Sequence, residues 1–273
     1  MKFRLFTFAH ENPVEWGNSI LSQRIAFLNY TKNGFKEDEI IEFTDDDIKD
    51  LVAKCPDHFN PLPWFLGHFV WRPYLFLKVL NDLDYGDIAI GSDIGSLVVG
   101  DIKDGLLTFM KEKCEDMFFF KEAIPMYMDC KRDLFYQIPV DYEKYKDYRL
   151  LRGCFWAVRK TKQTEFYINK VYENMLKIEN VDQTVRIEKN PDDFVLNHSD
   201  EAVLTLTLIN QGFDFISFTN KVDSFLNDYK NFKLIIHVCR NIRNIEGLKK
   251  ACDILQFTWK DFEYLANYLI TYD

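Results

Sequence analysis

The chain has 273 residues and a formal net charge of −9, and no basic stripe relieves this charge. A surface that binds the phosphate backbone needs Lys and Arg massed on one face, so we do not expect nucleic acid as a partner. An anionic membrane would repel the protein as a whole, although peripheral contact through a local basic patch stays open.

Composition indicates a protein that can bury a sizeable core. The hydrophobic share is 47%, with 25 Phe, which suits one large α/β domain or two small ones. Residues 1–8 are too short and interrupted for a signal peptide, and no run approaches the ~20 apolar residues that span a bilayer. The 6 cysteines are scattered without a CxxC pair. We therefore expect reduced thiols, a cytoplasmic location and no transmembrane segment.

Strand-like and helix-like segments alternate along the chain. Residues 3–8 are rich in aromatic and β-favouring residues, which predicts a first strand. Residues 19–33 carry apolar side chains at helical spacing, and Gly34 is placed to end that helix. The further strands that we predict cover residues 40–43, 88–90, 117–120, 150–158, 213–218 and 233–239. The further helices cover residues 44–53, 74–80, 104–113, 164–176 and 200–211.

Such alternation predicts an α/β fold with a mostly parallel sheet and helices on both faces. Helical spacing returns after Asn244, and no convincing linker interrupts the chain. We therefore predict one domain over residues 1–245, with residues 246–273 as a helical C-terminal extension packed on it. The sequence gives no indication of an oligomeric state.

The predicted strand 88–90 leads into a candidate ligand site. It ends in small residues and one carboxylate, Asp93, within the segment Gly91-Ser92-Asp93-Ile94-Gly95. In open α/β sheets, ligands bind just beyond the carboxyl ends of the strands, and the glycines would let a ligand approach Asp93 closely. The alternative is a turn in which the Asp side chain bonds its own backbone.

Two other pairs of Asp residues are less suited to a metal site because of where they stand. Asp45 and Asp47 fall in the first turn of a predicted helix, where carboxylates favour the helix dipole and stay solvated. Asp82 and Asp84 follow a helix and precede a strand, which is the wrong end of the sheet. Asp93 is therefore our candidate metal ligand.

A metal site would need more than this one carboxylate. Mg²⁺ and Mn²⁺ commonly take one or two carboxylates together with substrate phosphates. His237 follows three apolar strand residues, again at a carboxyl end, and is our candidate for a second ligand or a phosphate contact. The alternative for His237 is a purely structural role.

Several motifs, taken in order, resemble a known family. Trp71-Arg72-Pro73-Tyr74 resembles a Trp-Lys-Pro-Tyr helix start, and Gly86-Asp87-Ile88-x-Ile90-x-x-Asp93-x-Gly95 resembles a strand that ends in an Asp-Ala-Gly variant of the Asp-x-Asp motif. The later matching segments are Cys130-Lys131-Arg132-Asp133-Leu134-Phe135, Gly153-Cys154-Phe155-Trp156-Ala157-Val158-Arg159-Lys160, His198-Ser199-Asp200-Glu201-Ala202-Val203-Leu204, and Ile236-His237 with Arg240-Asn241. Over residues 1–245, their order and spacing resemble nucleotide-sugar-dependent glycosyltransferases with the GT-A fold, often associated with capsule or surface-glycan assembly.

The resemblance implies a GT-A (Rossmann-like) fold and a glycosyl transfer reaction. The donor would be a nucleotide sugar, with a UDP-sugar as our choice, and the acceptor a hydroxyl of a glycan or another molecule. The resemblance also implies a Mn²⁺ or Mg²⁺ ion that bridges Asp93 and both phosphates and neutralises charge as the glycosidic bond breaks. His237 would supply another metal or phosphate contact.

The resemblance further suggests roles for residues outside the metal site. The residues expected to contact the donor nucleotide or its phosphates are Thr7, Phe8, Ala9, His10, Arg72 and Ser92. Lys131 and Arg132 are expected to contact phosphate or sugar, and the alternative is a solvated surface pair. Asp133 would accept hydrogen bonds from sugar hydroxyls. Asp200 is a candidate general base or sugar contact, with a helix-start acid as the alternative.

Some positions depart from the resembling family. Arg72 replaces a usual Lys, Glu201 replaces a usual Gln, and Ile94 replaces a small residue in a place where it could narrow the diphosphate pocket. Together these departures leave open a weakened or altered enzyme. Ile94 and the missing second carboxylate of the motif support a second hypothesis, a catalytically inactive GT-A-like binding or scaffold protein. A nucleotidyltransferase is disfavoured because residues 7–11 contain no glycine for a phosphate loop.

Overall fold

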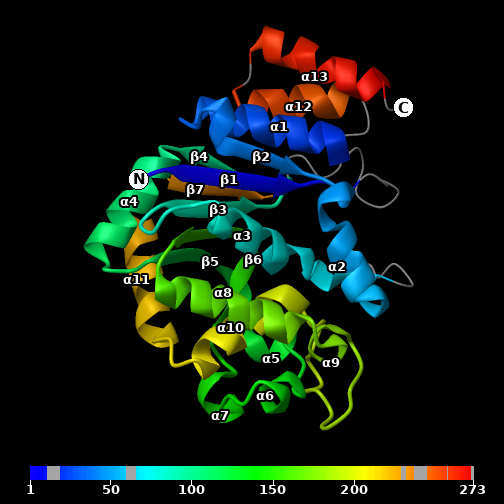
Figure 1. The fold of residues 1–273 in the computed structure, drawn as a ribbon, viewed down its shortest axis with the longest axis vertical. Helices are drawn as coiled ribbons and strands as arrows, with labels where there is room; N and C mark the ends of the chain where they lie inside the picture. The colour runs from blue at the N-terminus through cyan, green and yellow to red at the C-terminus, as the bar shows by residue number, and fades with distance from the viewer. Residues whose placement is uncertain (11–18, 60–65, 229–231, 237–244, 257, 272–273) are drawn as a thin grey trace.

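The structure, a computed structural model, describes residues 1–271 apart from residues 11–18, 60–65, 229–231, 237–244 and 257. A five-stranded sheet with strand order β2-β1-β3-β6-β5 forms its centre (Figure 1). The strands of this sheet are β1 (Phe3–Phe8), β2 (Ile40–Phe43), β3 (Ile88–Ser92), β5 (Met117–Pro125) and β6 (Arg149–Arg159). β1 pairs in parallel with β2 and β3, whereas β6 is antiparallel to β3 and β5. Four strands thus run one way and β6 the other, which confirms the predicted α/β fold with a mostly parallel sheet.

Helices surround the sheet. The longer ones are α1 (Ser19–Lys32), α3 (Trp71–Asn81), α4 (Ile102–Glu112), α8 (Lys162–Met175), α10 (Ser199–Asn210), α11 (Phe215–Asp228), α12 (Ile245–Ile254) and α13 (Trp259–Thr271). The shorter ones are η1 (Glu37–Glu39), η2 (Asp45–Ile48), α2 (Lys49–Lys54), η3 (Pro56–His58), η4 (Leu66–Phe69), α5 (Met126–Asp129), α6 (Leu134–Gln137), α7 (Tyr142–Tyr145) and α9 (Ile178–Val181). None of the described helices combines the length and apolar content needed to cross a bilayer.

Parallel pairing places the carboxyl ends of β1, β2 and β3 at one edge of the sheet. Leu5 of β1 lies opposite Ile40 of β2 and Ile90 of β3, and all three side chains are buried. Apolar runs of this kind suit strands that are covered on both faces. The residues that follow the three strands therefore meet at the edge where open α/β sheets bind ligands.

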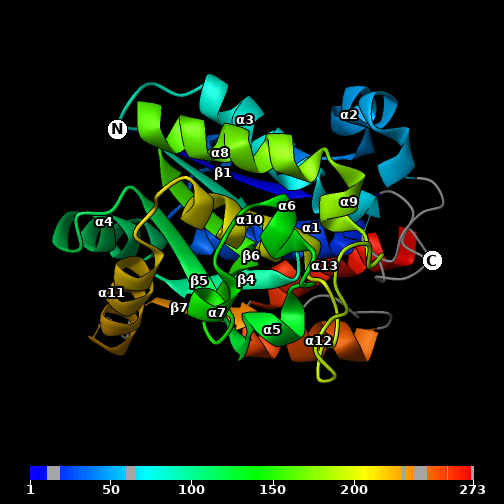
Figure 2. The same cartoon turned by 90° about the horizontal axis from the view of Figure 1, so that it is seen from below.

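Aromatic contacts assign the helices to the two faces of the sheet. On one face, Phe6 of β1 packs on Phe76 of α3 with ring centroids 5.4 Å apart. On the other face, Phe118 of β5 packs on Phe109 of α4 at 4.9 Å. α8 and α10 lie with α3, whereas α1 and α11 lie with α4 (Figure 2). Helices cover both faces, as predicted.

The segment predicted as a strand over residues 213–218 is instead the beginning of α11, so that prediction was wrong. The buried side chains of α11 are Phe215, Phe218, Thr219, Val222 and Phe225, which recur every three or four residues. This helical period lets one face of the segment pack against β5 and α4. It outweighs the local preference of aromatic and β-branched residues for strands.

A second, two-stranded sheet follows Asp93. β4 (Ser96–Gly100) pairs antiparallel with β7 (Phe232–Ile236), with Ser96 opposite Ile236. Part of β7 falls within the predicted strand 233–239, whereas β4 was not predicted. Because the apolar core of β4 is only Leu97-Val98-Val99 between Ser and Gly, its sequence has little strand signal of its own.

The C-terminal helix α13 packs on α1, and α12 packs on α13 (Figure 2). Nζ of Lys32, in the last turn of α1, lies 2.6 Å from Oδ2 of Asp261 in α13. The helical tail is therefore present where helical spacing predicted it. Its division from residues 1–245 as a separate unit stays a prediction.

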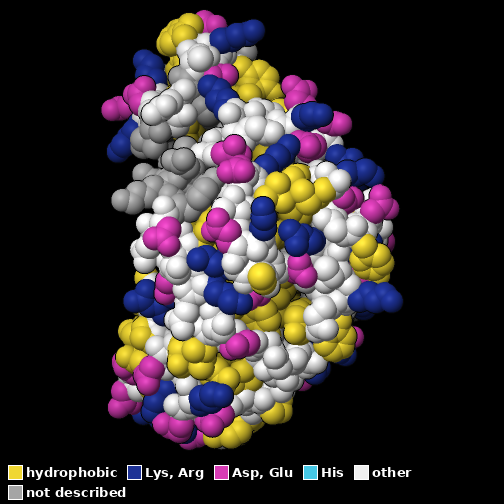
Figure 3. All heavy atoms as spheres, turned by 90° about the vertical axis from the view of Figure 1, so that its left-hand side faces the viewer, with side chains coloured by type: hydrophobic (Ala, Val, Ile, Leu, Met, Phe, Trp, Pro, Cys, Tyr) yellow, Lys and Arg dark blue, Asp and Glu magenta, His cyan; other side chains and the backbone are white. Residues whose placement is uncertain are grey.

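Charges of both signs are interspersed on the face of the molecule shown in Figure 3, where the described Lys and Arg side chains alternate with Asp and Glu. Lys221 of α11 is paired with Glu115 at 2.6 Å. The described part of this face therefore lacks the continuous basic stripe that nucleic-acid binding requires.

Candidate functional site

Arg72 joins Asp93 and Asp200 beside the carboxyl end of β3. Nη2 of Arg72 lies 2.5 Å from Oδ1 of Asp93, and Nη1 donates a hydrogen bond to Oδ2 of Asp200. The Arg72 and Asp200 side chains are each 5% exposed and that of Asp93 is 14% exposed. These three residues, the Arg72 cluster, bring together a strand end and the beginnings of two helices.

Arg72 is held in place by the start of α3 and by aromatic rings. Pro73 stands in the first turn of this helix, where its missing N–H removes no helical hydrogen bond. The guanidinium carbon lies 4.9 Å from the ring centre of Phe69, 5.0 Å from Trp71 and 6.0 Å from Trp156. Cation–π contacts of this kind stabilise a charge away from water and orient the plane of the guanidinium.

Backbone contacts position the two carboxylates. The N–H of Asp93 donates to the carbonyl of Cys154 at 2.9 Å, which continues the β3–β6 ladder by one residue. Asp200 lies in the first turn of α10, where the helix dipole favours a negative charge. Just before it, the hydroxyl of Ser199 donates to the carbonyl of His68 at 3.2 Å, which ties α10 to η4.

Gly153 makes the approach of Arg72 and Asp200 possible. A Cβ atom at this position of β6 would overlap both Oδ2 of Asp200 and Nη1 of Arg72. The sequence motif contained Gly153 but gave it no role. The available signal was a glycine inside a strand, which often marks the close approach of another group.

The last residues of β1 and those that follow it lie at the same edge as the Arg72 cluster, because β1 and β3 are parallel. Thr7 is buried and accepts a hydrogen bond from Nε2 of Gln23 at 3.3 Å, and Phe8 is stacked on Trp71 with centroids 4.5 Å apart. The N–H of Ala9 donates to the carbonyl of Phe43 at 3.0 Å. The predicted nucleotide contacts of Thr7, Phe8 and Ala9 stay predictions.

His10 and Ser92 complete this edge. Nδ1 of His10 lies 2.7 Å from Oδ2 of Asp45, and both side chains are 28% exposed. Oγ of Ser92, at the end of β3, is buried and accepts a hydrogen bond from the Tyr30 hydroxyl at 2.6 Å. His10 is thus partly open to a ligand. The donor contacts of both residues remain predicted.

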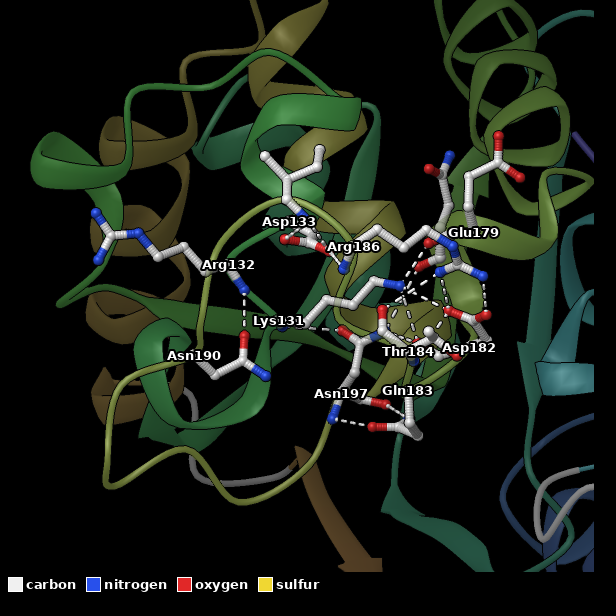
Figure 4. Close-up of polar contacts among 12 residues, drawn as sticks. Lys131, Arg132, Asp133, Glu179, Asp182, Gln183, Thr184, Arg186, Asn190 and Asn197 are labelled. Carbon is white, nitrogen blue, oxygen red and sulfur yellow. Dashed lines mark hydrogen bonds and ion pairs between the residues drawn. The ribbon is translucent and has the colours of Figure 1, made fainter.

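Lys131 is buried inside a network of loop oxygens (Figure 4). Its ammonium donates to the carbonyl of Glu179, to the carbonyl of Asp182 at 3.0 Å and to Oδ1 of Asp182 at 2.9 Å. Burial alone would raise the pKa of Asp182, but hydrogen bonds from Arg186 and Lys131 hold it well below its ordinary value. The alternative of a solvated surface position is wrong for Lys131. Its predicted contact with phosphate or sugar is untested.

Asp133 holds the same loop from the other side (Figure 4). Its carboxylate accepts hydrogen bonds from three consecutive backbone N–H groups, those of Arg186, Ile187 at 3.0 Å and Glu188 at 2.7 Å. Burial would raise the pKa of Asp133, but these hydrogen bonds lower it overall. Nε of Arg132 lies 2.9 Å from Oε2 of Glu188. The structure thus gives Asp133 and Arg132 loop-holding contacts, and their predicted sugar contacts stay predictions.

Among the described residues, Asp93 is the one predicted metal ligand, and it could offer a divalent cation a single carboxylate. Arg72 contacts Oδ1, but a carboxylate has about four lone-pair sites, and the Asp93 side chain is partly exposed. His237, the other predicted ligand, lies outside the described residues. Among the described residues, no group of three His, Cys, Asp or Glu could hold a metal ion. An ion on Asp93 would therefore rely on substrate phosphates, as Mg²⁺ commonly does.

No family model matches the chain, and no curated protein matches it. Among solved structures, mouse Xyloside xylosyltransferase 1 in its apo form is similar over 78% of this chain and 83% of that chain, with 10% identity and a TM-score of 0.44.

Proposed function

We propose that the protein is a glycosyltransferase that takes a sugar from a nucleotide-sugar donor, with a UDP-sugar as our choice, and passes it to a hydroxyl of a glycan or another acceptor. The donor would bind at the sheet edge formed by the ends of β1 and β3 and the Arg72 cluster. The observation that carries this proposal is the contact of one guanidinium with both Asp93 and Asp200.

The cluster supports the proposal because it unites segments that the sequence resemblance singled out separately. Arg72 and Asp93 are 21 residues apart, and Arg72 and Asp200 are 128 residues apart. Gly153, from a further motif, packs directly against them. If the motifs resembled the family only by chance, their residues would not be expected to meet at one point on the ligand-binding edge of the sheet.

The chemistry of the cluster suits a sugar diphosphate. Carboxylates accept hydrogen bonds from sugar hydroxyls, and guanidinium groups donate to phosphate and carboxylate oxygens. Because Oδ2 of Asp200 already accepts a hydrogen bond from Arg72, we assign Asp200 to sugar binding rather than to proton removal. In the transfer, the acceptor hydroxyl oxygen would bond to the anomeric carbon, the bond from that carbon to the diphosphate would break, and the hydroxyl proton would pass to the departing diphosphate.

Asp93 is the residue that would hold Mn²⁺ or Mg²⁺. The cluster contains one positive and two negative side chains, so an anionic diphosphate needs a further positive charge to bind beside it. When bound, the ion would neutralise charge on the diphosphate leaving group. Asp93 would orient that ion, and Arg72 would fix the carboxylate that holds it.

The second candidate function is a non-catalytic binding or scaffold protein of the same fold. The observation that favours it is Ile94, directly after Asp93, where the resembling family has a small residue. The motif around Asp93 also lacks a second carboxylate. Such a protein would bind no activated sugar or would bind one without breaking it down.

A thermal-shift screen separates these two functions. The purified protein is heated with UDP-, GDP- and CMP-sugars, with and without Mn²⁺, and donor hydrolysis is followed in parallel. A donor at 100 times its Kd stabilises the native state by about 2.7 kcal/mol, which raises the Tm by roughly 5–10 °C for a chain of this size. No shift and no hydrolysis with any donor would favour the scaffold.

A pair of variants tests whether the signal comes from Asp93. Asp93→Asn should abolish the Mn²⁺-dependent shift and the hydrolysis, because the amide lacks the charge that holds the ion. Asp192→Asn is the matched control, since the Asp192 side chain is 94% exposed and pairs only with Lys189 in the described part of the chain. An Asp93→Asn protein that responds like the control would exclude Asp93 as the metal ligand.

A further inference from the structure

A polar groove lies between α11 and the turn that joins α4 to β5. Its volume is about 520 Å³, and the side chains that line it include Lys113, Asp214, Ser217, Asn220, Lys221 and Ser224. Pockets that bind small molecules commonly have volumes of about 300–1,000 Å³. Asp214, Asn220 and Ser224 are exposed, so a ligand can enter the groove directly from solvent.

The groove lies at the edge of the sheet opposite the Arg72 cluster. Lys113 stands just before β5, and β5 runs in the same direction as β3 because both pair antiparallel with β6. The beginnings of these strands therefore lie at this edge, whereas Asp93 follows the end of β3. α4 and α11 form the left-hand side of Figure 1, which faces the viewer in Figure 3. The groove is thus separate from the proposed donor site.

Two contacts hold α11 against the turn after α4. Nζ of Lys113 donates a hydrogen bond to Oγ of Ser224 at 3.2 Å, and Nζ of Lys221 lies 2.6 Å from Oε1 of Glu115. Between Lys113 and Glu115, Cys114 has a left-handed backbone with a φ of 54°. Gly is the usual residue at such a helix end, because a Cβ atom makes this conformation costly. The strained turn directs Lys113 and Glu115 towards α11.

One positive charge in the groove is not neutralised by another side chain in the described part of the chain. Lys221 is paired with Glu115, and Lys121 is paired with Asp223 nearby. The half-buried Lys113, by contrast, contacts a neutral hydroxyl and no carboxylate among the described residues. Its ammonium has three N–H donors. Lys113 therefore has donors and a charge to offer to an anionic group.

The other side chains of the groove suit hydroxyl groups. Ser217, Asn220 and Ser224 recur every three or four residues of α11 and so line one face of the helix. Serine hydroxyls and the Asn amide both donate and accept hydrogen bonds. Oδ1 of Asp214 accepts the N–H of Ser217 at 3.2 Å, and its carboxylate can accept further hydrogen bonds from solvent or a ligand. From Asp214 to Ser224 the chain rises about 15 Å, a length that several linked sugars would span.

We propose that this groove binds a sugar chain that carries an anionic group, either a carboxylate or a phosphate. The anionic group pairs with the ammonium of Lys113, and the hydroxyls of the neighbouring sugars bond to Ser217, Asn220 and Asp214. A lone phosphate would occupy only the end near Lys113. A nucleic acid, with a charge on every unit, would be repelled by the net charge of −9. The site is independent of the proposed transfer reaction.

Calorimetry on the full chain tests this site with four probes. They are hyaluronan hexasaccharide, which carries carboxylates, mannopentaose phosphate, neutral maltohexaose and inorganic phosphate. At least one of the two acidic oligosaccharides should bind about tenfold or more tightly than both maltohexaose and inorganic phosphate, because hydrogen bonds to charged groups are the stronger ones. Which of the two binds better identifies the anionic group as a carboxylate or a phosphate.

Variants locate the bound sugar chain. Lys113→Met should weaken the binding of the preferred probe about 10- to 100-fold, and Asn220→Ala about 2- to 10-fold. Lys189→Met is the matched control, since the Lys189 side chain is 86% exposed and pairs with Asp192 outside the groove. Asp93→Asn should bind the probe like the wild type, so the groove can be tested whether or not the proposed function holds. Unchanged midpoints of urea unfolding show that each variant is folded.

Several results would overturn the proposal. One is the absence of binding by both acidic oligosaccharides, and another is equal binding of acidic and neutral chains. Inorganic phosphate that binds as tightly as the oligosaccharides would reduce the groove to a simple anion site. A folded Lys113→Met protein that binds like the wild type would place the ligand elsewhere, and loss of binding in Asp93→Asn would place it at the Arg72 cluster.

Discussion

Arg72 and Asp200 are 128 residues apart in the sequence, yet Nη1 of one donates a hydrogen bond to Oδ2 of the other. The second arm of the same guanidinium reaches Asp93. A lysine, with a single ammonium, lacks the fixed fork that holds two carboxylates at set angles. The usual Lys of the resembling family is therefore not equivalent to Arg72 in this chain.

Replacing Arg72 should destabilise the protein strongly. Arg72→Met removes the guanidinium from the buried carboxylate of Asp200 and from the partly exposed one of Asp93, and breaking a buried ion pair of the first kind costs about 3–5 kcal/mol. Arg72→Lys keeps the charge and should cost less. The free energy of unfolding in urea measures both changes.

A matched control is Arg159→Met, at the other end of β6. Arg159 pairs with Asp116 at 3.0 Å, with side chains that are 26% and 43% exposed. Loss of such a surface pair should cost no more than about 1 kcal/mol. Equal losses in Arg72→Met and Arg159→Met would show that the Arg72 cluster is not a buried network.

Gly153→Ala should disturb the Arg72 cluster from the opposite side. The new methyl group would overlap Arg72 and Asp200, and overpacking of this kind costs about 1–3 kcal/mol. Both unfolding in urea and donor binding should be impaired. Gly86→Ala is the control, because its added Cβ meets nothing within 4 Å although the backbone angle φ of +92° makes it strained. A loss of donor binding in both variants would point to general destabilisation.

Much of this arrangement was predictable from the sequence. The strand before Asp93, the helix start around Arg72 and the helix start at Asp200 were all predicted, because each has a strong local pattern. That these three segments meet in space could be expected only from the rule that ligands bind at the carboxyl ends of strands.

That rule could not predict the contribution of Gly153. Because β6 is antiparallel to β3, the first half of β6 lies at the edge where β3 ends. Gly153 therefore reaches the site from the beginning of a strand. The sequence alone does not show that one strand of the sheet is reversed.

Lys131→Met separates the predicted ligand contact from a loop-holding role. Lys131 is fully buried and bonded to three loop oxygens, so its loss should destabilise the protein by about 3–5 kcal/mol. Lys189→Met, at a pair whose side chains are 86% and 94% exposed, should change stability by no more than about 1 kcal/mol. A Lys131→Met protein of normal stability that binds UDP-sugars weakly would instead support the predicted phosphate contact.

Acid should destabilise the protein through His68. Burial, together with the charge of His58, lowers the pKa of His68 to about 4. The unfolded chain takes up a proton near pH 6.5 while the folded protein does not, so stability falls as pH drops from about 6.5 towards about 4, by roughly 2 kcal/mol.

His68→Asn should reduce this loss, because Asn does not titrate and tolerates the left-handed backbone found at His68, with a φ of 51°. Urea unfolding of both proteins at about pH 4.5 and pH 7 measures the effect. Identical pH dependence in the two proteins would assign the acid sensitivity to other groups.

The close fit around Gly153 also constrains how this protein can change over generations. A side chain at position 153 would overlap the present positions of Oδ2 of Asp200 and Nη1 of Arg72, so one or both would have to shift. Related proteins should therefore keep Arg72, Gly153 and Asp200 together. A relative that lacks the glycine should also lack the ion pair between Arg72 and Asp200. An inherited combination of this kind would be visible in an alignment before any enzyme assay.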